Sequence, residues 1–229
     1  MKKTVIYSFK HSLPILVGFI PVGLAYGVLM QSAGYNFAWT GACSLFVFAG
    51  SLQFLMVSFF AGGVSLITVA VMALLLNSRH IFYGLPFIEK FRKYGGWKYF
   101  LMYSLTDENF SLHCSQTAED GVNEKWAHIL SAFFTLVYWV VVSTAGALIG
   151  SLIPFDTTGI DFALTALFIT ILLDMIRGAD SLLPAVIAFA SSVLSLAMIG
   201  ADNFILPSLV VTVAVLILFR GKLGKEGAK

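Results

Sequence analysis

Residues 13–30 read LPILVGFIPVGLAYGVLM, and no charged side chain interrupts them. The run is close to the length of about 20 apolar residues that an α-helix needs to cross the hydrocarbon core of a bilayer. It lies inside a longer stretch, from Lys10 to Arg79, whose interior contains no Asp, Glu, Lys or Arg. Because a water-soluble domain needs charged side chains on its surface, this stretch predicts helices that lie in a membrane.

The rest of the chain has the same apolar character. Of its 229 residues, 59% are hydrophobic and 11% are charged, whereas soluble domains carry about 25% charged residues. Continuous apolar runs favour helices over the alternating strands of a barrel. We therefore expect an all-α, polytopic integral membrane protein, a single membrane domain over residues 1–229 with about seven transmembrane helices. The predicted segments are residues 13–30, 39–60, 64–83, 127–152, 162–176, 181–200 and 204–219.

The basic residues indicate how the chain is oriented. They gather at the N-terminus, in the loop at residues 89–98 and in the C-terminal tail, and the positive-inside rule places all three in the cytoplasm. Three complete crossings before the loop would instead place it outside. Either the second segment is broken at Gly50 and Ser51 and returns to the side it left, or the loop is an exception to the charge rule. We favour the broken helix, which transporters use to build sites at mid-membrane.

A weak internal repeat suggests a duplicated architecture. A helix with a Gly-xxx-Gly pair is followed by the pattern Gly-x-x-Phe-Ala-x-Thr at residues 23–40 and again at residues 146–165. Such pairs of small residues let helices approach closely. Each pair therefore predicts a close neighbour, either within the chain or from a partner. The pairs are Gly23 with Gly27 and Gly146 with Gly150.

Three polar clusters interrupt the apolar segments, and polar groups inside a membrane are costly enough to suggest function. The first is residues 48–53, FAGSLQ, which contains Phe48, Gly50 and Gln53. A helix break here would free backbone N–H groups that attract a carboxylate, and the Gln53 amide can donate or accept a hydrogen bond. The alternative is that Gly50 only permits close packing while Gln53 bonds a neighbouring helix.

The second cluster is residues 77–80, NSRH, which contains Asn77, Arg79 and His80. The Arg79 guanidinium could bind a carboxylate with two hydrogen bonds. The His80 imidazole could exchange a proton near neutral pH. The alternative is the end of a helix, with Arg79 reaching toward the membrane interface.

The third cluster is residues 106–110, TDENF, inside the ambiguous stretch 99–116. Two adjacent residues of this cluster, Asp107 and Glu108, cannot both ionise cheaply in an apolar environment, so one of the two carboxyl groups should have a raised pKa. Such a pair suits proton coupling or the binding of an ammonium group. The alternative is a turn that faces water between two short helices.

Other classes of protein find little support. The chain has no His-Glu-x-x-His motif, phosphate-binding loop or Gly-x-Ser-x-Gly elbow, so we expect neither an enzyme nor a cofactor. Cys43 and Cys114 lie in or near apolar segments, and the histidines are scattered, so neither a disulfide nor a metal site is predicted. A net charge of +2, with the basic residues at the ends and in one loop, does not suggest nucleic-acid binding.

Taken together in order and spacing, the three clusters resemble the AzlC family, the large subunits of branched-chain amino acid exporters. Gly159 with Phe162 and Ala163 adds a fourth similarity, and the resemblance extends from about Ser8 to Phe219. It implies a transport domain in the cytoplasmic membrane that exports leucine, isoleucine, valine and sometimes methionine. It also implies a small hydrophobic AzlD-like partner subunit and coupling to the proton gradient. From the three clusters themselves, the residues predicted to bind substrate or couple protons are Phe48, Gly50, Gln53, Asn77, Arg79, His80, Asp107 and Glu108.

Two other functions stay open from the sequence. A proton- or ion-conducting channel would use the acidic pair and His80 without an amino acid pocket. A membrane scaffold that transports nothing would keep its activity after uncharged substitutions at Arg79 and Asp107. Efflux of labelled leucine would distinguish an exporter from both.

Overall fold

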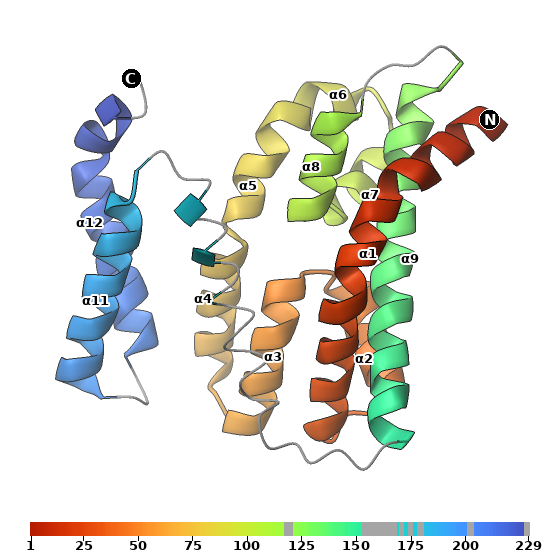
Figure 1. The fold of residues 1–229 in the computed structure, drawn as a ribbon. Coiled ribbons are helices and arrows are strands. Elements are labelled where there is room, and N and C mark those ends of the chain that lie inside the picture. The colour runs from red at the N-terminus through yellow and green to blue at the C-terminus, as the bar shows by residue number, and fades with distance from the viewer. Residues whose placement is uncertain are drawn as a thin grey trace. The chain divides into compact units, whose positions relative to one another are not determined.

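The computed structural model describes residues 1–116, 121–152, 181–200 and 204–226, together with Ile169, Leu172, Leu173, Ile176 and Arg177. Nearly all of the predicted segment 162–176 and the second Gly-x-x-Phe-Ala-x-Thr pattern lie outside the described residues. Within them the chain is helical and contains no strand (Figure 1). The elements are α1 (Lys2–Ser32), α2 (Phe37–Phe46), α3 (Gly50–Gly62), α4 (Leu66–Asn77), α5 (Arg79–Gly84), the 3-10 turn η1 (Leu85–Phe87), α6 (Ile88–Arg92), α7 (Trp97–Tyr103), α8 (Asp107–Ser115), α9 (Glu124–Leu152), α11 (Leu183–Ile199) and α12 (Ile205–Glu226).

The helices form two compact units. The first comprises Met1–Val64 and Leu76–Thr158, and the second comprises Ser65–Leu75 and Gly159–Lys229. The first unit contains all three polar clusters. In the second unit, the apolar helices α11 and α12 pack against each other. The single membrane domain over the whole chain stays a prediction.

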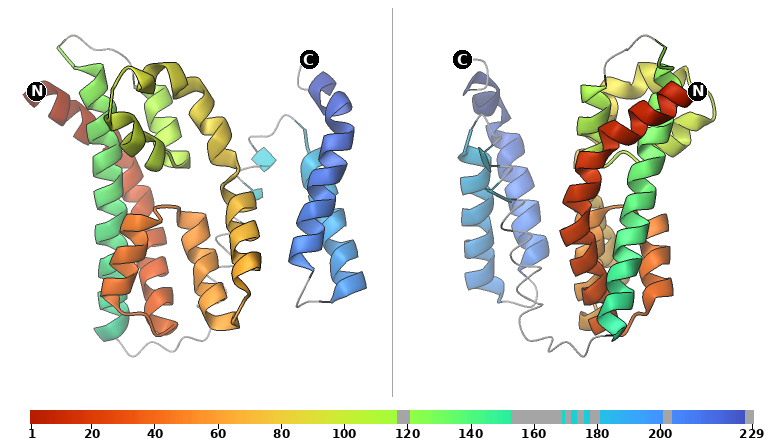
Figure 2. Two further views of the ribbon diagram at one scale, coloured as in Figure 1. Left: turned by 180° about the vertical axis from the view of Figure 1, so that it is seen from behind. Right: turned by 45° about the vertical axis from the view of Figure 1, so that its right-hand side comes forward.

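The scaffold of the first unit is the pair α1 and α9, which lie side by side in all views (Figures 1 and 2). Helix α1 begins at Lys2, earlier than the predicted start at residue 13. Its first turns are polar yet ordered, because Thr4, Ser8 and Ser12 are fully buried. The Ser8 hydroxyl donates to the Ala127 carbonyl at 3.3 Å. Hydrogen bonds therefore extend the helix beyond the stretch that hydrophobicity alone identifies.

Glycines allow α1 and α9 to touch through their backbones. A Cβ atom placed on Gly27 would overlap the backbone of Ser143 and Ala147, and one on Gly146 would overlap the backbone of Leu24. The two predicted glycine pairs thus find their close neighbour in each other, within this chain. They provide no separate support for a partner subunit.

The predicted break in the second segment is confirmed. Helices α2 and α3 contain 10 and 13 residues, about 15 and 20 Å in length, so neither crosses the ~30 Å hydrocarbon core. The two short helices are antiparallel and form a hairpin whose turn is at residues 47–49 (Figures 1 and 2). This hairpin keeps the loop before α7 at the same end of the unit as the N-terminus. There, the Thr4 hydroxyl accepts from the Asn123 N–H at 3.1 Å, and the next residue, Glu124, lies 2.7 Å from Lys90 Nζ through its Oε1, which brings the basic loop to this end.

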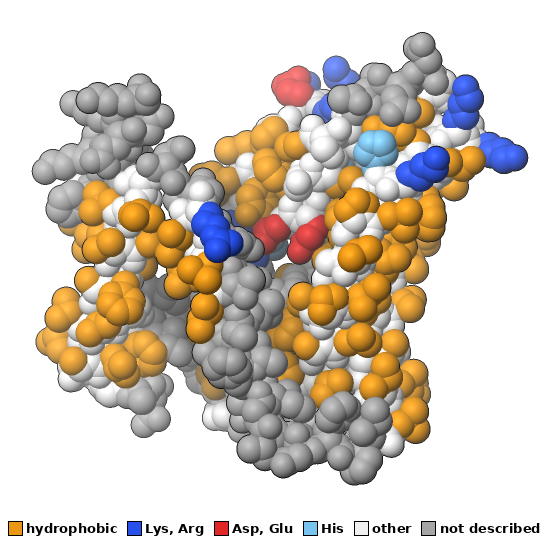
Figure 3. Space-filling view, in the orientation of Figure 1, with side chains coloured by type: hydrophobic (Ala, Val, Ile, Leu, Met, Phe, Trp, Pro, Cys, Tyr) orange, Lys and Arg blue, Asp and Glu red, His pale blue; other side chains and the backbone are white. Residues whose placement is uncertain are grey.

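The surface and the long helices are those of a membrane protein. Among the described residues, three helical stretches are long and apolar enough to cross a bilayer: Lys2–Ser32, Leu66–Arg92 and Glu124–Leu152. Many large apolar side chains are exposed, and hydrophobic side chains dominate the face drawn in Figure 3. Over the first unit, Lys and Arg side chains gather near the N-terminus (Figure 3). The chain is an all-α membrane protein, while the number of about seven crossings stays a prediction.

Candidate functional site

The α2–α3 break places the start of a helix inside the first unit. Phe48 has a φ angle of 41°, a conformation that costs a non-glycine residue free energy. It is held there by burial, because its side chain is only 3% exposed. Helix α3 then begins at Gly50, and the preceding Ala49 offers no side-chain cap. The first N–H groups of α3 are consequently available to another acceptor.

A second break occurs between α7 and α8. The outer ends of both helices lie near the start of α9, since Trp97 packs on Trp126 with ring centroids 5.6 Å apart and His113 contacts His128. The inner end of α7 reaches the first break, where the Tyr103 hydroxyl donates to the Leu45 carbonyl. The break between α2 and α3 and the break between α7 and α8 are therefore in contact.

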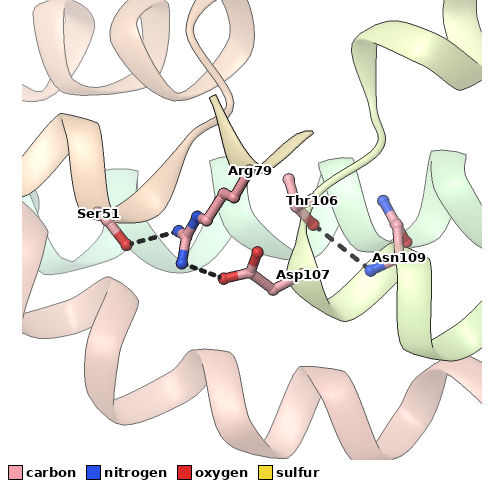
Figure 4. Close-up of polar contacts among 5 residues, drawn as sticks. All are labelled: Ser51, Arg79, Thr106, Asp107 and Asn109. Carbon is pink, nitrogen blue, oxygen red and sulfur yellow. Dashed lines mark hydrogen bonds and ion pairs between the residues drawn. The ribbon is translucent and has the colours of Figure 1, made fainter. Parts of the chain in front are cut away.

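Helix α8 begins at the site with a defined cap. The Thr106 side chain accepts from the Asn109 N–H at 3.4 Å (Figure 4). The Asn109 amide donates to the Ser104 carbonyl at 2.6 Å and accepts from the Thr135 hydroxyl of α9 at 2.8 Å. These contacts fix the first turn of α8 and hence the position of Asp107.

Arg79 connects the two breaks. It is the first residue of α5, where α4 ends. Its Nη1 lies 2.9 Å from Asp107 Oδ2, and its Nη2 donates to Ser51 Oγ at 3.1 Å (Figure 4). The Arg79 side chain is 25% exposed and the Asp107 side chain 41%. Arg79 Nε and Asp107 Oδ1 are buried and have no hydrogen-bond partner among the described residues, so the pair has unused capacity for a ligand.

These groups surround a small cavity of about 40 Å³. Six of the eight residues proposed from the sequence line it: Gly50, Asn77, Arg79, His80, Asp107 and Glu108. Ala49, Ser51 and Thr106 also line it and were not among the eight. Thr106 stands where the N-cap of a helix starting at an acidic residue is expected, and this signal could have identified it.

Phe48 and Gln53 are placed elsewhere. The Gln53 amide is fully buried, donates to Ser44 Oγ at 3.1 Å and accepts from the Trp139 indole N–H at 2.8 Å. It joins α2, α3 and α9 and has the packing role that was the alternative for this residue. Phe48 packs near Tyr103, with ring centroids 6.1 Å apart.

The arrangement suits a ligand that carries both charges. The Arg79 guanidinium and the N-terminal end of α3 present positive potential to the cavity. The carboxylates of Asp107 and Glu108 present negative charge beside it. No group of three or more His, Cys, Asp or Glu side chains that could hold a metal occurs among the described residues.

Comparison with known proteins identifies relatives of the chain. The family model described as AzlC protein matches residues 14–153. A Bacillus subtilis protein named branched-chain amino acid transport protein AzlC is 32% identical over 218 residues, which cover 95% of this chain and 86% of that protein. An uncharacterized membrane protein of Helicobacter pylori is 32% identical, with 94% and 95% covered. The Escherichia coli inner membrane protein YgaZ is 29% identical, with 76% and 74% covered. No solved structure matches the chain.

Proposed function

Because this chain belongs to the AzlC family, we propose that it is the large subunit of a secondary transporter that exports branched-chain amino acids across the cytoplasmic membrane. Its proposed substrates are leucine, isoleucine and valine, with methionine as a further one. The name of the B. subtilis relative supports the substrate class. The name of the E. coli relative supports the membrane.

The observation that carries this proposal is the ion pair between Arg79 and Asp107 beside the cavity. A free amino acid carries the same two charges, on its carboxylate and its ammonium group. The carboxylate would bind the Arg79 guanidinium and the N–H groups at the start of α3, and the ammonium group would bind Asp107. An amino acid can therefore replace the internal ion pair charge for charge, without leaving an unpaired ion in apolar surroundings.

Under this proposal, the structure represents a closed conformation, in which the cavity does not admit the substrate. About 40 Å³ is far below the roughly 300 Å³ at which ligand pockets begin, so we infer that leucine needs a larger cavity than the one present while Arg79 and Asp107 are in contact. Separation of the pair would admit the substrate, and its return would close the empty site. Alternating access requires such a change around a fixed site.

Glu108 is the proposed proton carrier. It lines the same cavity, but it forms no ion pair within the part of the chain that the structure describes. A proton can neutralise it without breaking a salt bridge. His80 also lines the cavity.

A small hydrophobic subunit of the AzlD type is the proposed partner. The family resemblance supports this assignment, whereas the glycine pairs of α1 and α9 do not, because they are occupied by each other. The partner therefore belongs in any test of transport.

The test is efflux of labelled leucine from cells that lack other branched-chain exporters and are loaded with a leucine dipeptide. Cells that express the chain with the small subunit should export leucine faster than cells without them. Arg79→Gln should reduce export to background at an unchanged protein level, and Arg79→Lys should retain part of it because the charge remains. Lys93→Gln, which removes an exposed charge away from the cavity, is the matched control. Normal export by Arg79→Gln would refute the site, and proton flux without leucine efflux would identify a channel.

A further inference from the structure

A large apolar groove lies beside the last turns of the Leu66–Arg92 stretch. It has a volume of about 710 Å³ and runs between the α5–η1–α6 segment and α7. Exposed aliphatic side chains form much of its wall, including Ile81, Leu85, Ile88 and Met102. The volume lies within the range of about 300–1,000 Å³ that is typical of ligand sites.

One end of the groove is cationic. Arg92 and Lys98 both line it, and no acidic residue does so among the described lining residues. Neither cation forms an ion pair within the described residues, in contrast to Lys90, whose Nζ lies 2.7 Å from Glu124 Oε1. The Lys98 ammonium lies 4.9 Å from the centre of the Tyr99 ring. The groove is thus apolar along its length and positively charged at its mouth.

The length of the groove matches one leaflet of a bilayer. Arg92 is the last residue of a stretch able to cross the membrane, and His80 lines the inner end of the groove. His80 and Arg92 are twelve positions apart, which spans about 18 Å along a helix, and half of a ~30 Å hydrocarbon core is about 15 Å. An acyl chain that lies along the groove would therefore place its headgroup near Arg92 and Lys98.

We propose that this groove binds one anionic phospholipid from the leaflet on the side of the 89–98 loop. Its acyl chains pack against Ile81, Leu85 and Met102, and its phosphate lies between Arg92 and Lys98. Charge complementarity favours this occupant over a zwitterionic lipid, because two cations without acidic partners face the headgroup. It also favours lipid over an apolar helix of a partner, which would leave both cations unpaired at the membrane surface.

The experiment measures lipid binding by the purified full-length chain, reconstituted in nanodiscs of dioleoyl phosphatidylcholine with and without dioleoyl phosphatidylglycerol. Phosphatidylglycerol should raise the unfolding temperature and be retained in native mass spectra. The double variant Arg92→Gln/Lys98→Gln should bind it about 10–30-fold more weakly, since each cation near the surface contributes about 1 kcal/mol. The matched control, Lys2→Gln/Lys93→Gln, removes the same charge from exposed positions outside the groove and should bind as the wild type does.

A second variant tests the apolar part of the groove. Ile88→Trp should fill it and displace phosphatidylglycerol, whereas Val141→Trp, at a similarly exposed site on α9, should not. Equal stabilisation by both lipids, or unchanged binding by the double variant, would overturn the proposal. Retention of phosphatidylglycerol by Ile88→Trp would overturn it as well, and loss of the small subunit when Ile88→Trp is purified from cells that express both proteins would assign the groove to the partner protein instead. Because binding is measured without transport, these results are independent of the export test.

Discussion

At the scale of single residues, the two acidic neighbours of the site have different surroundings. Successive residues point about 100° apart on a helix, so Asp107 meets Arg79 at 2.9 Å, while Glu108 lines the cavity and has no ionic partner in the part of the chain that the structure describes. Substitution of each should therefore separate substrate binding from proton coupling.

Glu108→Gln should abolish leucine export driven by a pH gradient but leave exchange of labelled for unlabelled leucine largely intact, because exchange moves no net proton. Asp107→Asn should lose both, since it removes the proposed ammonium partner and leaves the Arg79 charge unpaired. Both activities can be measured in liposomes that contain the chain and its small subunit. A response of Glu108→Gln to the pH gradient equal to that of the wild type would show that this carboxyl group does not carry the proton.

The residue scale is also where prediction from the sequence reached its limit. Gln53 and Ser51 lie two positions apart, so their side chains point about 200° apart on α3. The sequence marks both as polar groups in an apolar segment, but it does not reveal which face of the helix meets the cavity. The structure directs Ser51 to Arg79 and Gln53 to Trp139. Only the packing of α3 within the first unit, against α1, α2 and Trp139 of α9, decides between them.

At the scale of elements, interrupted helices build the site. The scaffold is held by the close contact between the glycine pairs of α1 and α9, here called the glycine seam. The break before Gly50 could be predicted, because the charge pattern and the small residues agreed. Residues 99–116 stayed ambiguous, since their mixture of apolar and charged side chains fits either a crossing or two short helices. The close approach of Gly27 to Gly146 could not be assigned from the sequence, because a Gly-xxx-Gly pair does not identify its partner.

The seam gives a prediction within one helix. Gly27→Ala should lower the stability of the protein by about 1–3 kcal/mol, the usual cost of an overfilled contact, because its Cβ would overlap the backbone of α9. Gly18→Ala is the control, since nothing lies within 4 Å of a Cβ at that position. Thermal unfolding of the purified variants measures the difference. Equal unfolding temperatures for both variants would contradict the close contact.

At the scale of the whole molecule, the half-helices α2 and α3 determine on which side the later segments lie. Because the α2–α3 hairpin returns to the end at which it began, the N-terminus and the 89–98 loop lie at the same end of the first unit. The positive-inside rule predicts that this side is the cytoplasm. The overall helical class followed from composition, whereas the orientation stays a prediction and segment 162–176 falls almost entirely outside the described residues.

Cysteine labelling tests the orientation in a background without Cys43 and Cys114, both of which are free thiols. Lys2→Cys, Lys93→Cys and Lys225→Cys should react with a membrane-impermeant maleimide only after the cells are opened. Ser32→Cys, at the far end of α1, should react in intact cells. Labelling of Lys93→Cys but not Lys2→Cys from outside would show that the two positions lie on opposite sides and that α2 and α3 do not form a hairpin.

The seam between α1 and α9 also has a consequence for how the protein is made. Ser8 and Ala127 bond to each other although 119 residues separate them. At translation rates of about 5–20 residues per second, the ribosome needs about 6–24 s to synthesise that interval. During this time α1 has entered the membrane while its glycine face and the buried hydroxyls of Thr4, Ser8 and Ser12 have no α9 to contact. The insertion machinery or surrounding lipid must accommodate that unfinished surface until the second half of the scaffold arrives.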